Sequence, residues 1–227
     1  MRQARFYGLG DPACIVATRR LAHEAAMLDN TIRARIDPTL LAVGRWLSER
    51  GASPNGVTLA AFAIGLAAGG AIWVEAYWLG LILILLSRIG DGLDGWVARA
   101  SNRQSDFGGF LDIVLDFAFY GLIPVAFALA DPAANAVPAA VLVLTFYVNG
   151  ASFLAYATMA EKRGTPQRGT KSLLYTTGLA EATETIVVFC LMCVLPGLFA
   201  WLAYGFALVC AYTTFSRVML ARAAFRD

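Results

Sequence analysis

Long apolar stretches separated by short polar connections occupy most of the chain after residue 50. Six of these stretches approach or reach the roughly 20 residues that a helix needs to cross a bilayer. Because lipid offers no partner to backbone polar groups, such stretches are expected to be helices. The pattern therefore predicts an all-α integral membrane protein with six transmembrane helices. The predicted helices span residues 57–74, 77–99, 108–130, 136–160, 181–195 and 198–217.

The first 52 residues precede these spans and are predicted to form a cytoplasmic or interfacial segment, while residues 53–227 form the six-span domain. Within the segment, the run from Leu40 to Leu47 places apolar residues and Trp46 beside Arg45 and Arg50. Apolar and basic faces on one short helix favour the membrane surface over a span. We therefore predict an N-terminal interfacial amphipathic helix.

Basic residues gather on one side of the predicted spans. Eight of the 18 Lys and Arg residues precede the first span, and the others lie around the second and fourth connections or at the end of the chain. By the positive-inside rule, those connections and both termini are cytoplasmic. The composition, 59% hydrophobic and 15% charged, excludes an ordinary soluble domain. We expect an integral protein of a bacterial inner membrane.

Four aspartates fall at the end of the second predicted span and the start of the third. Asp91 and Asp94 lie one turn apart on one helix, and Asp112 and Asp116 lie one turn apart on the next. A short connection makes the two helices antiparallel neighbours, so their carboxylates can converge. Intramembrane charges need pairing, water or a metal. The four carboxylates therefore predict a cytoplasmic-side site for two Mg²⁺ or Mn²⁺ ions, suited to displacement at phosphorus.

Other readings of the same residues stay open. Intramembrane aspartates also line ion pathways, so a divalent-cation channel or carrier is an alternative. Cys190 and Cys193 form a C-x-x-C within an apolar span, where they are either packing residues or a metal or redox pair. With His23 as the only histidine, a Ser-His-Asp triad or a multi-histidine zinc site is excluded within one chain.

The aspartates belong to a longer pattern, D-x-x-D-G-x-x-A-R-x8-G-x3-D-x3-D, which resembles the signature of the CDP-alcohol phosphatidyltransferases. The chain matches all eight fixed positions, at Asp91, Asp94, Gly95, Ala98, Arg99, Gly108, Asp112 and Asp116. The resemblance implies that two divalent ions bridge the aspartates and the diphosphate of CDP-diacylglycerol. An acceptor hydroxyl attacks, CMP leaves, and Asp116 is both a ligand and the general base. A scaffold that has lost catalysis is a further alternative, against which the intact carboxylates argue.

The resemblance also implies the partners and the nucleotide-binding face. The expected partners are CDP-diacylglycerol, a small alcohol acceptor, membrane lipids and a second copy in a homodimer, with no nucleic acid. The implied nucleotide residues are Gly95, Ala98, Arg99 and Gly108. Upstream, Ser53-Pro54-Asn55-Gly56-Val57-Thr58 resembles the Pro-Asn-x-x-Thr entry to the family's first span. Asn55 and Thr58 therefore either meet the nucleotide or only begin a helix that Ser53 caps.

Charged side chains near the membrane surface are the candidates for acceptor binding. Basic ones suit a phosphate-bearing acceptor such as glycerol 3-phosphate, and acidic ones suit an ammonium or hydroxyl group. The candidates are Arg88, Lys162, Arg163, Arg168, Lys171, Glu181, Glu184 and Arg217. The positive-inside rule and the helix dipole explain the same residues without a ligand.

The segment after Asp112 resembles no single branch of the family. Branches that use glycerol phosphate often read Asp-Pro-x-x-Asp-Lys here, whereas this chain has Ile113 and Phe117 after the two aspartates. The serine-using branch has an aromatic-Gly-x-x-Pro segment, which this chain shares, but Phe119 stands where that branch has a serine. Glycerol 3-phosphate and serine are therefore both candidate acceptors.

Overall fold

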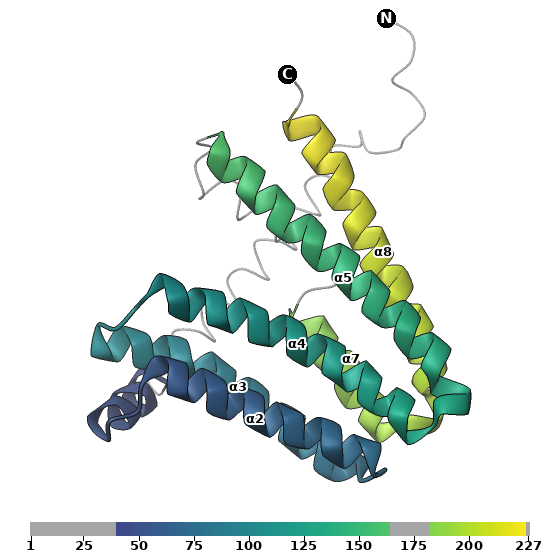
Figure 1. Cartoon of the computed structure of the whole chain (residues 1–227), viewed down its shortest axis with the longest axis horizontal. Helices are drawn as coiled ribbons and strands as arrows, with labels where there is room; N and C mark the ends of the chain where they lie inside the picture. The colour runs from purple at the N-terminus through teal and green to yellow at the C-terminus, as the bar shows by residue number, and fades with distance from the viewer. Residues whose placement is uncertain (1–39, 164–181, 226–227) are drawn as a thin grey trace, which may run out of the picture.

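A computed structural model of the protein describes residues 40–163 and 182–225 (Figure 1). Within these two ranges it is helical and contains no strand. Residues 40–49 form a first helix. The later elements are α2 (Pro54–Trp73), α3 (Tyr77–Ser101), α4 (Asp106–Ala130), α5 (Pro132–Lys162), α7 (Ala182–Val194), the short 3-10 helix η1 (Pro196–Leu198) and α8 (Phe199–Ala224). The predicted all-α class is confirmed.

Polar caps and prolines set where three of the helices begin. The Ser53 side chain accepts a hydrogen bond of 3.1 Å from the backbone N–H three residues later, and Pro54 follows at the first helical position of α2. Ser105 and Asp131 cap α4 and α5 in the same way, at 3.0 and 3.1 Å. Asp131 also ends α4, so α4 and α5 are joined by a single residue.

Each of the six predicted spans coincides with one helix of the structure. Among the described residues, four helices are both long and apolar enough to cross a membrane: α2, α4, α5 and the η1–α8 unit. The chain is therefore an integral membrane protein. Helix α3 is 25 residues long but carries Arg88, Asp91 and Asp94, and α7 has only 13 residues. The count of six spans stays a prediction.

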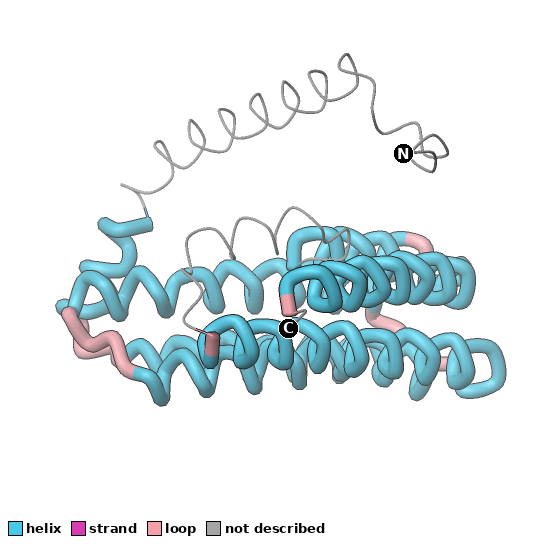
Figure 2. Tube along the Cα trace, turned by 90° about the horizontal axis from the view of Figure 1, so that it is seen from above, coloured by secondary structure: helices cyan, strands magenta, loops and turns pink. Residues whose placement is uncertain are grey.

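The view from above shows the helices arranged in two layers (Figure 2). Helix α2 packs against both α3 and α4, α4 packs against α5, and α5 pairs with α8. In Figure 1, α5 and α8 run side by side and diverge from α4 toward their C-terminal ends. The consecutive antiparallel helices α3 and α4 thus bring the two aspartate pairs to the same end of the molecule.

Small residues allow α2 to approach its neighbours closely. A Cβ atom on Gly65 would lie 2.8 Å from the ring of Phe119 on α4 and 3.1 Å from the hydroxyl of Ser87 on α3. The Ser87 hydroxyl instead donates a buried hydrogen bond of 2.8 Å to the backbone carbonyl of Ala61 on α2. Close backbone approach and interhelical hydrogen bonds replace the hydrophobic effect that is missing within a bilayer.

Aromatic side chains form the centre of the helix bundle. Phe119 and Phe127 on α4 are fully buried among residues of α2, α3, α7 and α8. The Phe127 ring stacks on that of Phe199 with centroids 4.6 Å apart, and Phe119 meets Phe189 edge to face at 6.3 Å. These contacts anchor the helix that carries Asp116 about one turn and Asp112 about two turns before Phe119.

The predicted amphipathic helix is present as residues 40–49, although its position relative to a membrane stays a prediction. It packs against α3 at Gly44, where an added Cβ would lie 2.9 Å from the backbone of Trp96. Its exposed Trp46 ring stacks under the guanidinium of Arg50 at 3.9 Å. An exposed tryptophan beside an arginine is typical of a membrane-surface helix.

Candidate active site

A tight turn connects α3 to α4, and both helices pack against α2 at the site. Asn102 ends α3 in the left-handed conformation with φ of 52°, which asparagine tolerates better than most residues. The backbone N–H of Arg103 then donates to the carbonyl of Ala98 at 3.0 Å, and Ser105 caps α4. Three of the four predicted metal ligands meet between these helices: one carboxylate oxygen each from Asp91, Asp112 and Asp116, all within 4.8 Å of one another.

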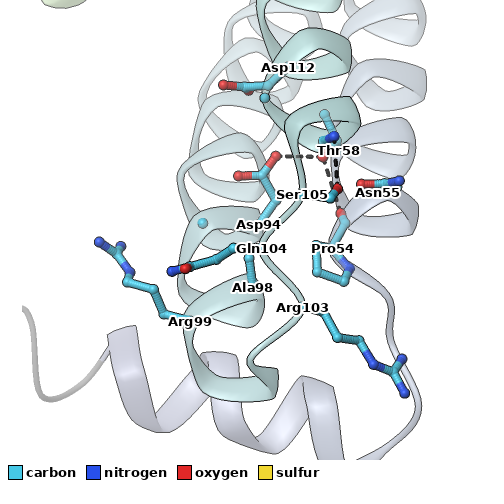
Figure 3. A pocket seen from close by; sticks show the side chains of 13 residues that line it. Pro54, Asn55, Thr58, Asp94, Ala98, Arg99, Arg103, Gln104, Ser105 and Asp112 are labelled. Atoms are coloured by element: carbon cyan, nitrogen blue, oxygen red, sulfur yellow. Dashed lines mark hydrogen bonds between the residues drawn. The ribbon is translucent and has the colours of Figure 1, made fainter.

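Asp94 lies one turn nearer the end of α3 and has a different partner. Its Oδ2 accepts a hydrogen bond of 2.5 Å from the hydroxyl of Thr58, which also lies 3.1 Å from the carbonyl oxygen of Pro54 on α2 (Figure 3). Thr58 is buried, so this bond links α2 to α3 inside the site. The sequence predicted Thr58 to meet the nucleotide or to begin a helix, and it did not predict the bond to Asp94, which joins residues 36 positions apart.

A pocket of about 310 Å³ opens beside Asp94 and Asp112 (Figure 3). All six residues predicted for the nucleotide line it: Asn55, Thr58, Gly95, Ala98, Arg99 and Gly108. They come from three helices, α2, α3 and α4. The structure thus gathers residues that are spread over more than 50 positions of the sequence.

Two glycines of the signature serve the pocket in different ways. A Cβ on Gly108 would lie 3.1 Å from the Asn55 side-chain oxygen, so glycine allows α4 and α2 to approach there. A Cβ on Gly95 would meet only Arg99 Nη2, at an ordinary 3.8 Å. Packing within the protein therefore does not require glycine at position 95. The space beside this glycine is open to a ligand in the pocket.

Arg88 is the basic side chain that lies among the aspartates. Its Nη1 lies 2.6 Å from Asp116 Oδ1 and 3.4 Å from Asp91 Oδ2. The prediction placed Arg88 at the acceptor, and the structure places its guanidinium against two of the predicted metal ligands.

A second pocket, of about 320 Å³, has Asp116 in its wall. Asp116 lines it together with Tyr120, Asn149, Gly150 and Arg217, which come from α4, α5 and α8. Arg217 is buried and donates from Nη1 to the carbonyl and side-chain oxygens of Asn149, both at 2.9 Å. This places a cation in the wall of the pocket.

The family model described as CDP-alcohol phosphatidyltransferase matches residues 52–221. The chain belongs to this family. It is 45% identical over 194 residues to the inner membrane protein YnjF of Escherichia coli, covering 85% of this chain and 94% of that protein. It is 39% identical over 107 residues to the phosphatidylinositol phosphate synthase of Streptomyces avermitilis, covering 46% of this chain and 43% of that protein.

Solved structures show the same fold. The phosphatidylinositol phosphate synthase of Mycobacterium tuberculosis with CDP-DAG bound has a TM-score of 0.65 at 17% identity, covering 81% of this chain and 93% of that chain. Its apo form has a TM-score of 0.64 at 16% identity, covering 79% and 94%. As a CDP-alcohol phosphatidyltransferase, the protein is a phosphotransferase of phospholipid biosynthesis. Family membership favours catalysis over the channel or carrier that intramembrane aspartates alone would allow.

Three of the remaining acceptor candidates of this CDP-alcohol phosphatidyltransferase lie within the described residues, and these three line neither pocket. Lys162 ends α5, and Arg163 donates a 3.1 Å hydrogen bond to the carbonyl of Phe225. Glu184 is exposed in the first turn of α7. Arg168, Lys171 and Glu181 lie outside the described residues.

Sequence reasoning missed part of each pocket. Arg103, Gln104 and Ser105 line the first one from the turn between α3 and α4. The signature specifies only the length of the segment between Arg99 and Gly108. The basic residue in that segment, Arg103, was the one sequence feature that could have indicated a contact with an anionic ligand. In the second pocket, Tyr120 is the aromatic residue of the aromatic-Gly-x-x-Pro segment, and Asn149 belongs to no motif. The C-x-x-C pair contributes to packing. Cys193 is buried in the core, Cys190 packs against it, and neither forms a disulfide.

Proposed function

We propose that the enzyme transfers a phosphatidyl group from CDP-diacylglycerol to a small phosphorylated polyol and releases CMP. The observation that carries the proposal is the position of the aspartates between two pockets. Asp94 and Asp112 line the first pocket, Asp116 lines the second, and Asp91 joins Asp112 and Asp116 in the cluster. A donor in one pocket and an acceptor in the other would meet at the carboxylates.

The first pocket is proposed as the site of the CDP group. Its small residues, Gly95, Ala98 and Gly108, leave room for a flat base, and Arg99 offers a fork of donors to phosphate oxygens. The related fold of the Mycobacterium tuberculosis synthase with CDP-DAG bound supports this donor.

The carboxylates fit a divalent-metal centre. With metal–oxygen bonds of about 2.1 Å, ligands on opposite sides of one Mg²⁺ lie about 4 Å apart, and the three clustered oxygens all lie within 4.8 Å of one another. Two Mg²⁺ or Mn²⁺ ions would be held by Asp91, Asp94, Asp112 and Asp116. The hydrogen bond from Thr58 would keep the Asp94 carboxylate in position. Bound there, the ions would neutralise charge on the diphosphate and stabilise the leaving CMP.

Asp116 is proposed as the general base. It lines the second pocket, where the hydroxyl of an acceptor would lie, and its Oδ1 is held by Arg88. In the reaction, the acceptor oxygen forms a bond to the β-phosphorus of the donor, the bond to the CMP oxygen breaks, and the hydroxyl proton passes to the Asp116 carboxylate.

A cation in the wall of the second pocket supports an anionic acceptor. Arg217 lies there, and named relatives of the chain are phosphatidylinositol phosphate synthases. Inositol phosphate and glycerol 3-phosphate are therefore the first acceptors to test, with serine third. From the distribution of basic residues, we also propose a site and termini on the cytoplasmic side. From the family resemblance, we propose a homodimer built from the domain of residues 53–227.

The deciding experiment uses purified protein in liposomes with labelled CDP-diacylglycerol and Mg²⁺ or Mn²⁺. We expect CMP release and a labelled lipid product with one phosphorylated polyol, and loss of both when EDTA removes the metal. If no lipid product forms with any acceptor, the scaffold role would be favoured over catalysis. Sustained Mg²⁺ flux across the liposome membrane without product would favour the carrier.

Replacing Gly95 by alanine should weaken donor binding while the fold is kept. The new methyl group meets no protein atom closer than 3.8 Å, yet it enters the first pocket. We expect the KM for CDP-diacylglycerol to rise by about tenfold, the scale of one misplaced methyl group. Gly92→Ala is the matched control, because Gly92 lies on the same helix with nothing within 4 Å and lines neither pocket. An unchanged KM for CDP-diacylglycerol in Gly95→Ala would contradict the proposal that CDP binds in this pocket.

Replacing Gly150 by alanine should disturb the second pocket alone. The added Cβ would overlap the ring of Phe117, at 1.9 Å, so this ring, which is 38% exposed and lines the same pocket, must move. We expect the KM for the acceptor to rise several-fold and the KM for CDP-diacylglycerol to stay constant. A change in the donor KM only would place the acceptor elsewhere.

A further inference from the structure

Arg88 is held in the carboxylate cluster by its surroundings as well as by its charge. Its side chain is only 9% exposed, and its Cζ lies 3.9 Å from the centroid of the fully buried Phe119 ring. Nη2 donates to the Ser87 hydroxyl at 3.2 Å. Among the described residues, the buried Nε has no hydrogen-bond partner. The guanidinium is therefore positioned through its two terminal nitrogens.

The carboxylates and this guanidinium depend on one another. A buried cation is strongly destabilising unless a carboxylate pairs with it. Conversely, three carboxylates with oxygens within 4.8 Å repel one another unless a cation lies between them. Arg88 Nη1 contacts both Asp91 and Asp116, so the cation lies beside two of the three clustered carboxylates.

We propose that Arg88 is the built-in counter-cation of the cluster and that it makes divalent-metal binding depend on the bound CDP-lipid. The inference rests on the proposed function. The four carboxylates and the one guanidinium together carry a net charge of −3. Two divalent ions would add +4 and leave the site with an excess of positive charge. The diphosphate of the donor supplies the missing negative charge. Without Arg88, the four carboxylates alone would balance two ions.

The test is Mn²⁺ binding to the full-length protein in detergent, followed by the EPR signal of free Mn²⁺, with and without CDP-diacylglycerol. The wild-type protein should bind Mn²⁺ at least about tenfold more tightly with the donor than without it. Arg88→Gln should bind Mn²⁺ tightly in both conditions, which means a gain of about tenfold or more without the donor. Arg222→Gln, which removes the same charge from an exposed position on α8, should behave as the wild type.

Equal or weaker Mn²⁺ binding by Arg88→Gln without the donor would overturn the counter-cation role. Arg88→Lys provides the second test, because it keeps the charge in a side chain that can reach the same carboxylates. It should retain the dependence on the donor, and loss of that dependence would contradict the inference even if Arg88→Gln fails to fold. Failure of the proposed function looks different. The wild-type protein would then bind no Mn²⁺ with the donor and release no CMP.

Discussion

Asp112→Asn should reduce phosphatidyl transfer by at least about a thousandfold, to the limit of detection, without unfolding the protein. Asp112 contributes an oxygen to the three-carboxylate cluster and also lines the first pocket. The amide has nearly the same shape but loses the charge that a divalent ion requires. CMP release from labelled CDP-diacylglycerol measures the loss, and a thermal melt in detergent measures the fold. Asp91→Asn should behave in the same way.

Asp106→Asn is the matched control for this prediction. Asp106 is an exposed acid in the first turn of the same helix and lines neither pocket. Its loss removes the same charge and weakens only a favourable contact with the helix dipole, at most about 1 kcal/mol. Near-normal turnover of Asp112→Asn with added Mg²⁺ or Mn²⁺ would contradict the metal assignment.

Asp116→Asn should lower turnover by about a hundredfold or more while CDP-lipid binding is largely kept. An asparagine side-chain oxygen can still accept the hydrogen bond from Arg88 Nη1, now 2.6 Å long, so the local geometry is preserved. The variant cannot take the proton of the acceptor hydroxyl. Single-turnover CMP release gives the rate, and metal-dependent binding of labelled CDP-diacylglycerol gives the affinity.

The same titration separates a base from a ligand. If Asp116 is chiefly a metal ligand, metal and donor binding collapse together with turnover, as they should in Asp112→Asn. Donor binding that survives in Asp116→Asn and is lost in Asp112→Asn would support the division of roles. Loss of donor binding in both would show that Asp116 is needed first as a ligand.

Helix positions and the signature could be predicted because both depend on local spacing. Apolar stretches fixed six helices to within a few residues at most ends, and α8 is the largest departure, continuing to Ala224 where residue 217 was predicted. Caps explain part of the difference, since Pro132 begins α5 four residues before the predicted start. The turn length between Arg99 and Gly108 was enough to bring the aspartate pairs together.

Side-chain partners across helices could not be predicted. Whether Arg88 faces an acceptor or Asp116 depends on how α3 and α4 are placed on α2, and in the structure Arg88 contacts both Asp116 and the ring of Phe119 on α4. Asp94 was grouped with the other aspartates, yet the hydroxyl of Thr58 on α2 binds it outside the three-carboxylate cluster. Asn149 and Gly150 join the second pocket only because α5 packs against α4 at that level.

One helix, α4, carries both Asp112 and Asp116 of the site and the phenylalanines that anchor the bundle. Occupancy of the site and resistance to heat are therefore linked, because a ligand that binds only the folded protein raises its free energy of unfolding. A ligand at one hundred times its dissociation constant adds about 2.7 kcal/mol. A library of phosphorylated polyols can thus be ranked by melting temperature, before any lipid product has been isolated.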